Sequence, residues 1–567
     1  MAMETANAAS RTAGGAAART HAEPLISSRY DCSSAADHEN GEVEVVEVAA
    51  SRWGSSRWVV LFGGMLLELC GGSIYITGLY SSDLRNRFFP GDGGQEQIEQ
   101  LVFACNLGNW LPVSGFFNDS RWGGSRNCAV IASGLTLLGY LGVSGWSSGK
   151  VQMDYWQIWL CWFLWGHGSG WFDNAAMTAT VRNFPAQRGR AVATMKAFYG
   201  LSGSILTQVY NVFFFRETTS FLLFLAIALA GLGACFSNLM FLVPTAMALD
   251  NRDKPGRRLD QALVLVVVLA LVLMGVSIVR SGTTDPDHSS DISIVGFVAV
   301  LGTLVMLMLI AVQGSREVKL DGGVNRFAST NTVAVAGGTV VPLTTALRTL
   351  EYWLLFLVTF VGMGSGIVVL NNAGQMMDAV GGTEQATALL VSVISIANCF
   401  GRITYGIVPD LVHTTVPRPI FVPINLTVMA LGQLLLTIST SASTYAGGIV
   451  AGFAYGGFWT LMPTLVVEIF GGKSFATLYN FMSLAVSSAS LIFSTLMAGS
   501  LYDQQAKLHP GLKQGSCSGP ECYRTTCYIM VGACAVGVAA SFILVKKMRD
   551  GPPALLRTRA DATSDQA

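Results

Sequence analysis

Charged side chains are scarce in this sequence. Only 12% of its 567 residues are Asp, Glu, Lys or Arg, against about 25% in a typical soluble domain, and 51% are hydrophobic. Lys plus Arg equals Asp plus Glu at 35 each, so no excess of positive charge points to a nucleic-acid partner. This composition excludes a soluble enzyme and a disordered protein. It favours helices packed in a lipid bilayer, where the 62 glycines let backbones approach closely.

Signatures of catalysis and nucleotide binding are missing as well. No Walker-type loop, Gly-x-x-x-x-Gly-Lys followed by Ser or Thr, occurs, so the sequence gives no sign of ATP-driven pumping. No His-Glu-x-x-His motif or cluster of Cys and His indicates a metal centre. The 11 cysteines mostly stand singly in apolar runs and are interpreted as small hydrophobic residues. We therefore expect a protein that is not an enzyme and needs no cofactor or metal.

Long apolar runs, in contrast, are frequent. Crossing the hydrocarbon takes about 20 mostly apolar residues in a helix. Fourteen such runs occur, near 58–80, 98–118, 126–146, 155–181, 190–213, 219–244, 260–280, 292–314, 350–371, 387–409, 418–438, 444–470, 474–502 and 527–547. The polar segments 1–57 and 549–567 are expected to be a disordered cytosolic arm and a cytosolic tail.

The charges of the connecting loops orient these spans. Lys and Arg are concentrated in alternate loops, on the side that the N-terminus shares, as at Arg182, Arg257 and Arg418. Such an excess is typical of cytosolic loops. Both termini are therefore predicted to lie in the cytosol. We expect a multi-pass protein of the plasma membrane, with the vacuolar or another internal membrane as the alternative.

An internal repeat divides the spans into two groups of six. Gly115-Phe-Phe-Asn-Asp119 ends the second span and Gly406-Ile-Val-Pro-Asp410 ends the tenth, and basic residues follow each. Ala193-Thr-Met-Lys-Ala-Phe198 likewise matches Ala476-Thr-Leu-Tyr-Asn-Phe481. Two parallel six-helix halves are the plan of the major facilitator superfamily, whose loop signature the Gly-x-x-x-Asp segments resemble. We predict halves at 58–244 and 350–548, with an inserted helix pair and a cytosolic loop at 245–349.

Further stretches resemble the nodulin-like family of plants and protists, a branch of that superfamily. They include Arg57-Trp58, Val181-Arg-Asn-Phe-Pro185, Asn371-Asn-Ala-Gly-Gln375, Phe400-Gly-Arg402, Tyr455-Gly-Gly-Phe-Trp459, Glu468-Ile-Phe-Gly471 and Tyr479-Asn-Phe481. The resemblance implies an all-α membrane protein with the facilitator fold, and it implies a transporter. It indicates no substrate. A monocarboxylate is suggested because the family is similar to oxalate and monocarboxylate carriers.

Ionisable residues inside the spans are the first candidates for a transport site, because charge is costly in lipid. In a facilitator fold the first and fourth helices of each half line the cavity. The resulting set is Glu68, Tyr75, His167, Asp173, Asn174, Lys196, Asn371, Asn372, Gln375, Arg402, Tyr455 and Trp459. Structural roles remain open. The acids could pair with Lys196 or Arg402 to hold the bundle, His167 could be an interhelical donor, and the Asn371–Asn372 pair could cap its helix.

A second set of candidates lies at the cytosolic helix ends and is expected to form a gate. It comprises Asp119, Arg121, Arg126, Arg182, Arg190, Asp410, Glu468 and Lys473. We expect Asp119 and Asp410 to bind basic or helix-N-terminal groups at the next helices. The repeat makes Arg182 and Glu468 equivalent, so we expect them to face each other. Simple solvated charges are the alternative. Cys517 and Cys522, in a non-cytosolic loop, would form a disulfide or remain two thiols.

The leading hypothesis is a secondary-active transporter that moves a small polar or anionic solute by alternating access. Glu68 would carry a coupling proton. A facilitated uniporter and a non-transporting membrane sensor or scaffold are the alternatives. The expected partners are the bilayer and the solute, with no nucleic acid, and the protein is expected to be monomeric.

Overall fold

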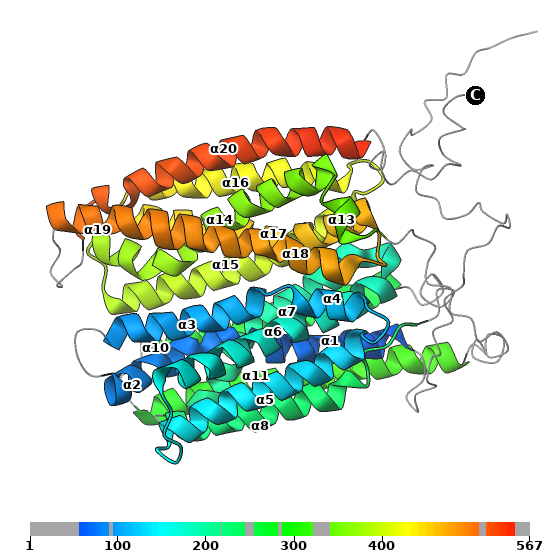
Figure 1. Cartoon of the computed structure of the whole chain (residues 1–567), viewed down its shortest axis with the longest axis horizontal. Helices are drawn as coiled ribbons and strands as arrows, with labels where there is room; N and C mark the ends of the chain where they lie inside the picture. The colour runs from blue at the N-terminus through cyan, green and yellow to red at the C-terminus, as the bar shows by residue number, and fades with distance from the viewer. Residues whose placement is uncertain are drawn as a thin grey trace, which may run out of the picture. The chain divides into compact units, whose positions relative to one another are not determined.

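The computed structural model describes residues 56–89, 94–215, 217–243, 255–281, 286–320, 341–509 and 517–549, and these are helical almost throughout (Figure 1). The predicted arm 1–57 and tail 549–567 lie almost entirely outside these residues. So do the loop residues 244–254 and 321–340 on either side of the predicted inserted pair.

The first group of helices corresponds to the first six predicted spans and is called the N-terminal half. It consists of α1 (Arg57–Gly71), α2 (Thr77–Phe88), α3 (Gly94–Trp110), α4 (Val113–Asp119), α5 (Ser125–Ser147), α6 (Tyr155–Asn183), α7 (Arg188–Phe213) and α8 (Thr218–Ser237). Two of its spans are broken. A 3-10 turn, Gly72–Ile76, separates α1 from α2, and Pro112 separates α3 from α4 because proline has no N–H for the helix.

The inserted pair is α10 (Pro255–Ser281) and α11 (Pro286–Leu320), and the C-terminal half follows. It consists of α13 (Leu343–Ala346), α14 (Leu350–Ala379), α15 (Glu384–Leu411), α16 (Phe421–Leu436), α17 (Ser441–Phe470), α18 (Phe475–Ala489), α19 (Gly499–Leu508) and α20 (Glu521–Arg549). A π-helical segment, Ser490–Ala498, joins α18 to α19. Each predicted span therefore coincides with helix, although the predicted boundaries of the halves stay predictions.

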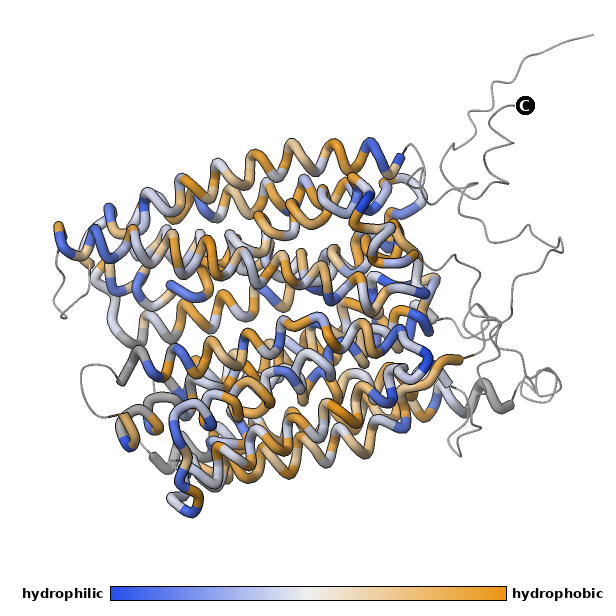
Figure 2. The backbone as a smooth tube through the Cα atoms, in the orientation of Figure 1, coloured by the Kyte–Doolittle hydropathy of each residue, from blue (hydrophilic) through white to orange (hydrophobic). Residues whose placement is uncertain are grey.

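Eleven helices in the described ranges are long and apolar enough to cross a membrane. Figure 2 shows the hydrophobic residues along their lengths. The predicted spans 98–118, 155–181 and 190–213 are helical but fall outside this set, because α3 is short and α6 and α7 carry more polar residues. The predicted class, an all-α membrane protein, is confirmed. The count of fourteen spans stays a prediction.

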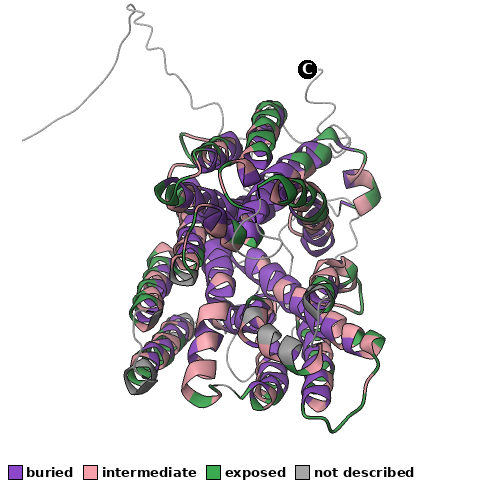
Figure 3. Cartoon of the chain, turned by 90° about the vertical axis from the view of Figure 1, so that its left-hand side faces the viewer, coloured by how far each residue is buried: buried purple, intermediate pink, exposed green. Residues whose placement is uncertain are grey.

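The two halves meet along a few helices. α7 contacts α15 and α17, and α18 contacts α3, α4 and α6. Of the inserted pair, α11 packs on α1 and α7, whereas α10 packs on α7 and on α15. Figure 3 shows buried residues where helices face one another and exposed residues on the outward faces. Polar side chains buried at the junction of the halves are therefore held by elements from both.

Candidate functional site

Four charged side chains lie where the halves meet, three of them buried and Asp173 partly exposed, and together they are called the central cluster. Glu68 comes from α1, Asp173 from α6, Lys196 from α7 and Arg402 from α15. Glu68 is 0% exposed, and Lys196 and Arg402 are each 1% exposed. Lys196 forms an ion pair with Asp173, and Arg402 donates a hydrogen bond to the backbone oxygen of Lys196. The cluster therefore connects the two halves directly.

Asp173 binds one residue from each half. Its Oδ1 pairs with the Lys196 ammonium, and its Oδ2 accepts a 2.8 Å hydrogen bond from the Tyr479 hydroxyl of α18. Lys196 and Tyr479 are the matching fourth residues of the repeated Ala-Thr segments. Sequence reasoning overlooked Tyr479, although the repeat carried the signal: if Lys196 reaches the junction from α7, its equivalent reaches it from α18.

Aromatic rings surround the Lys196 ammonium. The nitrogen lies 5.2 Å from the ring centre of Tyr199, 5.3 Å from that of Trp459 and 5.4 Å from that of Tyr479. Aromatic faces at such distances stabilise a cation. The Arg402 guanidinium lies 5.9 Å from the Trp459 ring. The sequence predicted Trp459. It did not predict Tyr199, because a tyrosine in an apolar helix is equally well interpreted as a residue that packs between helices.

Two predicted tyrosines border the cluster. The Tyr75 ring packs edge-on against Tyr199 at 5.6 Å, and Tyr455 packs edge-on against Trp459 at 6.2 Å. Tyr455 is buried, but Tyr75 is 45% exposed. One aromatic edge of the cluster is therefore accessible.

Glu68 has an unusual environment. Neither of its carboxylate oxygens meets a hydrogen-bond donor in the part of the chain that the structure describes. The carboxyl group of Asp173 lies within electrostatic reach of Glu68, as do Lys196 and Arg402. Two carboxylates repel each other at such range unless a proton lies between them. The arrangement therefore suits a bound proton.

Two predicted residues of α6 lie outside the cluster. His167 Nδ1 lies 2.8 Å from the Gly108 oxygen, and its Nε2 accepts a 2.9 Å hydrogen bond from Trp171. Both ring nitrogens are thus engaged, and the structural alternative describes this residue. Asn174 accepts a 2.7 Å hydrogen bond from Asn118 and donates at 3.2 Å to the Ala476 oxygen of α18. It therefore belongs with the contacts at the helix ends.

The predicted polar group at the end of α14 forms a separate network within the C-terminal half. Asn371 donates to Ser494 of the π-helical segment at 3.1 Å. The Tyr523 hydroxyl of α20 lies 3.1 Å from Asn372 Oδ1 and 3.2 Å from Gln375 Oε1. These hydrogen bonds join helices of the C-terminal half, and none of them reaches a residue of the central cluster.

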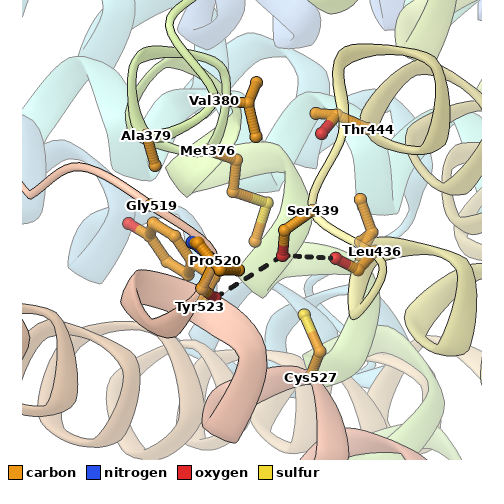
Figure 4. Close-up of a pocket in the computed structure, with 10 residues that line it drawn as sticks. All are labelled: Met376, Ala379, Val380, Leu436, Ser439, Thr444, Gly519, Pro520, Tyr523 and Cys527. Carbon is orange, nitrogen blue, oxygen red and sulfur yellow. Dashed lines mark hydrogen bonds between the residues drawn. The ribbon is translucent and has the colours of Figure 1, made fainter.

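A disulfide joins Cys517 and Cys522 beside this network. Its loop is held to α14 by a 2.8 Å hydrogen bond from the Gly519 amide to the Ala379 oxygen. A small pocket lies here (Figure 4), and its lining includes Met376, Leu436 and Tyr523. None of its ten lining residues is one of the predicted site residues. This pocket is therefore distinct from the central cluster.

The gate aspartates each bind the start of a helix in the opposite half. Asp119 Oδ2 accepts from the Thr477 amide of α18 at 2.8 Å, and Asp410 Oδ2 accepts from the Arg190 amide of α7 at 2.9 Å. Binding to helix N-termini agrees with our expectation, and Asp410 also pairs with Arg418 just before α16, the next helix, as predicted. The amides that the two aspartates bind, however, belong to helices of the opposite half and not to the next helices. The partners lie across the junction, because the helix ends of the two halves converge there.

Two glycines of the repeat allow this convergence. A Cβ atom at Gly115 would lie 2.5 Å from the Ala476 oxygen, and one at Gly406 would lie 2.4 Å from the Ala193 Cβ. Ala193 and Ala476 are themselves equivalent in the repeat. Each half therefore presses its Gly-x-x-x-Asp segment against the Ala-Thr segment of the other, which closes this end of the junction.

The predicted pairing of Arg182 with Glu468 is wrong in this structure. Arg182 binds Asp119 at 2.8 Å and donates to the oxygens of Gly472 and Lys473 at 3.0 and 2.6 Å. Glu468 pairs with Arg418 at 3.1 Å, and Arg418 also pairs with Asp410. Residues that are equivalent in a repeat occupy corresponding positions in the two halves, but they need not contact each other. Each aspartate instead attracts an arginine of its own half.

The remaining gate candidates have different surroundings. Arg121 and Arg126 are exposed, and the Arg121 guanidinium lies 5.0 Å from the ring centre of Trp122. Lys473 contributes its backbone oxygen. The Arg190 side chain pairs with Asp260 of α10 at 3.0 Å, a contact that the sequence did not suggest.

Comparison with known families covers most of the chain. The family model described as Nodulin-like matches residues 57–313, and the model for the NFD4 C-terminal domain matches residues 338–551. The chain therefore carries a nodulin-like domain over residues 57–313. This confirms the family resemblance drawn from the sequence. The first match ends within α11 of the inserted pair, and the second begins shortly before α13.

Relatives of this nodulin-like protein extend the comparison. It is 24% identical to Protein NUCLEAR FUSION DEFECTIVE 4 of Arabidopsis thaliana over 541 residues, which is 87% of this chain and 88% of the relative. It is 28% identical to Probable transporter MCH1 of Yarrowia lipolytica over 200 residues, or 34% of this chain and 41% of the relative. The second match therefore covers less than half of either chain.

A solved structure shares the fold. The proton:xylose symporter XylE of the major facilitator superfamily, bound to 6-bromo-6-deoxy-D-glucose, aligns with a TM-score of 0.54 and 14% identity. The alignment covers 86% of the nodulin-like chain and 95% of the symporter chain. The predicted facilitator fold is confirmed.

Proposed function

We propose that this nodulin-like protein is a secondary-active transporter that moves a small polar or anionic solute, such as a monocarboxylate, by alternating access coupled to protons. It would act as a monomer in the plasma membrane. The relatives named as transporters, Probable transporter MCH1 and the XylE symporter, support the transport class. The solute and the coupling are inferred from the residues of the central cluster.

The observation that carries the proposal is that four charges, three of them buried and Asp173 partly exposed, meet at the junction of two halves. Buried ion pairs cost desolvation energy that their attraction often fails to recover. Hydrophobic residues would hold the bundle at lower cost. In alternating access, the centre of the junction opens first to one side of the membrane and then to the other. Charged groups there can bind a proton and an anion on one side and release them on the other.

Glu68 is the proposed proton carrier. Its carboxyl group is fully buried with no donor among the described residues and lies within electrostatic reach of Asp173, so a proton on one of the two acids would relieve their repulsion. Water admitted from the other side of the membrane would receive that proton. The two carboxyl groups would then separate or bind the nearby cations.

Arg402 is the proposed site for an anionic group of the solute. Lys196 already pairs with Asp173. Arg402 binds the Asn398 side-chain oxygen at 2.9 Å and a backbone oxygen, and within the described residues no carboxylate forms an ion pair with it. Its positive charge is therefore available to a ligand. Trp459 beside it offers a flat surface, and the accessible Tyr75 hydroxyl offers a hydrogen bond.

The test uses the full chain in proteoliposomes with an imposed pH gradient and a panel of labelled monocarboxylates. Glu68→Gln should abolish pH-driven accumulation and leave some equilibrative exchange of the same solute. Glu351→Gln is the matched control, because Glu351 is also buried but lies in the first turn of α14. Full pH-driven accumulation by the Glu68 variant would contradict the proposed coupling. Accumulation of no solute by the wild type would favour a sensor or scaffold.

A further inference from the structure

The inserted helix α10 contacts both halves of the molecule. It packs on α7 of the N-terminal half and on α15 of the C-terminal half, whereas its partner α11 packs on α1 and α7. A helix that touches both halves cannot keep all of its contacts when the halves move relative to each other. Its contacts therefore favour the arrangement in which they form.

The first turns of α10 lie against Arg190. Arg190 Nη1 lies 3.0 Å from Asp260 Oδ1 and 3.3 Å from Oδ2. A Cβ atom at Gly256 would lie 2.9 Å from the same nitrogen, so this glycine leaves space for the guanidinium. The Arg190 side chain is 13% exposed and that of Asp260 is 51% exposed. The pair is thus half-covered and of moderate strength.

Arg190 also stands at the closest contact between α7 and α15. Its amide donates to Asp410, and a Cβ atom at the preceding Gly189 would lie 2.6 Å from the Gly406 oxygen. The backbone of Arg190 therefore seals the gate while its side chain binds α10. The position of this one residue depends on both contacts.

We propose that Asp260 is a positioning residue of the gate, which holds the start of α7 against Asp410 through the Arg190 side chain and so stabilises the closed gate. The inserted pair then acts as a brace that biases alternating access. This inference rests on the proposed alternating-access function, and it requires no assumption about the solute. A ligand or residue that favours one state shifts the populations by its differential energy.

The experiment measures the gate directly in the full-length protein. Spin labels are attached to cysteines introduced at Ser120 and Thr414, which are exposed and follow α4 and α15, with the exposed Cys235 replaced by serine. Double electron–electron resonance in lipid nanodiscs then reports the distance between the halves. Asp260→Asn is compared with Asp260→Glu and with Glu521→Gln, which removes the partly exposed Glu521–Arg524 ion pair at α20.

Asp260→Asn should increase the ratio of open to closed gate by about twofold to fivefold, the range expected for a partly exposed ion pair. Asp260→Glu and Glu521→Gln should keep the wild-type ratio. If two distances are found, and their ratio is the same in Asp260→Asn as in the wild type, the role of Asp260 is overturned and alternating access still stands. A single distance in every sample, including a Gly406→Val variant, would overturn both.

Discussion

Asp173 and its partners show which site residues can be selected from the sequence and which cannot. Charge inside an apolar run is conspicuous, so Glu68, Asp173, Lys196 and Arg402 could be selected from the sequence, and the structure brings all four together. Tyrosines carry no such signal, because a ring in a helix packs equally well against lipid or protein. The hydroxyl of Tyr479 acquires its role only from the helix that faces it.

At this scale we predict the energetics of the Asp173–Lys196 pair. Removing one partner leaves a buried charge uncompensated and should destabilise the protein by about 3–5 kcal/mol. Asp173→Asn and Lys196→Met should each lower the midpoint of thermal unfolding in detergent. The double variant should be less destabilised than the sum of the two. Additive effects would mean that the pair contributes no coupling energy to the fold.

Helix ends are governed by close packing and by free backbone amides. The repeat correctly indicated that Asp119 and Asp410 bind helix N-termini, and Asp410 pairs with Arg418 at the neighbouring helix as expected. The helix amides that both aspartates bind belong to the opposite half, which sequence order did not suggest. A pairwise contact between halves depends on their rotation about each other, which no local pattern encodes. The pair of Arg182 with Glu468 failed for that reason.

The elements at the gate support a steric prediction. Gly406→Val introduces atoms where a Cβ alone would already lie 2.4 Å from Ala193 Cβ, so the gate should be held open. With labels at Ser120 and Thr414, the longer distance should predominate, and pH-driven accumulation should fall. Gly134→Val is the control, because nothing lies within 4 Å of a Cβ there. Equal distance distributions in the two variants would refute the close approach.

For the whole molecule, apolar runs of sufficient length predicted every long helix among the residues that the structure describes. They did not predict the 3-10 turn after Gly71 or the π-helical segment after Ala489, because these irregularities depend on packing and leave hydropathy unchanged. The helices that fall outside the apolar set include α6 and α7, which carry Asp173 and Lys196. Polar side chains are stable in a membrane protein mainly inside the bundle, so low hydropathy indicated helices that carry polar residues at its centre.

Topology supplies the prediction at this scale. Residues 285 and 330 lie outside the described residues. The first precedes α11 and the second follows it. If α11 crosses the membrane, reporter tags at these two positions should be found on opposite sides, with residue 330 in the cytosol. Glycosylation-site and protease-protection assays can measure this. Tags on the same side would remove the inserted pair from the count of spans.

The two side chains that bind Asp173 belong to different halves of the molecule, which has a consequence for movement. Asp173 and Lys196 belong to the same half, so a rigid rotation of the halves carries both together, whereas Tyr479 belongs to the other half. The ion pair then survives the rotation and the tyrosine hydrogen bond does not. The Tyr479 hydroxyl is thus a natural spectroscopic reporter, whose vibrational frequency differs between the two arrangements without any label.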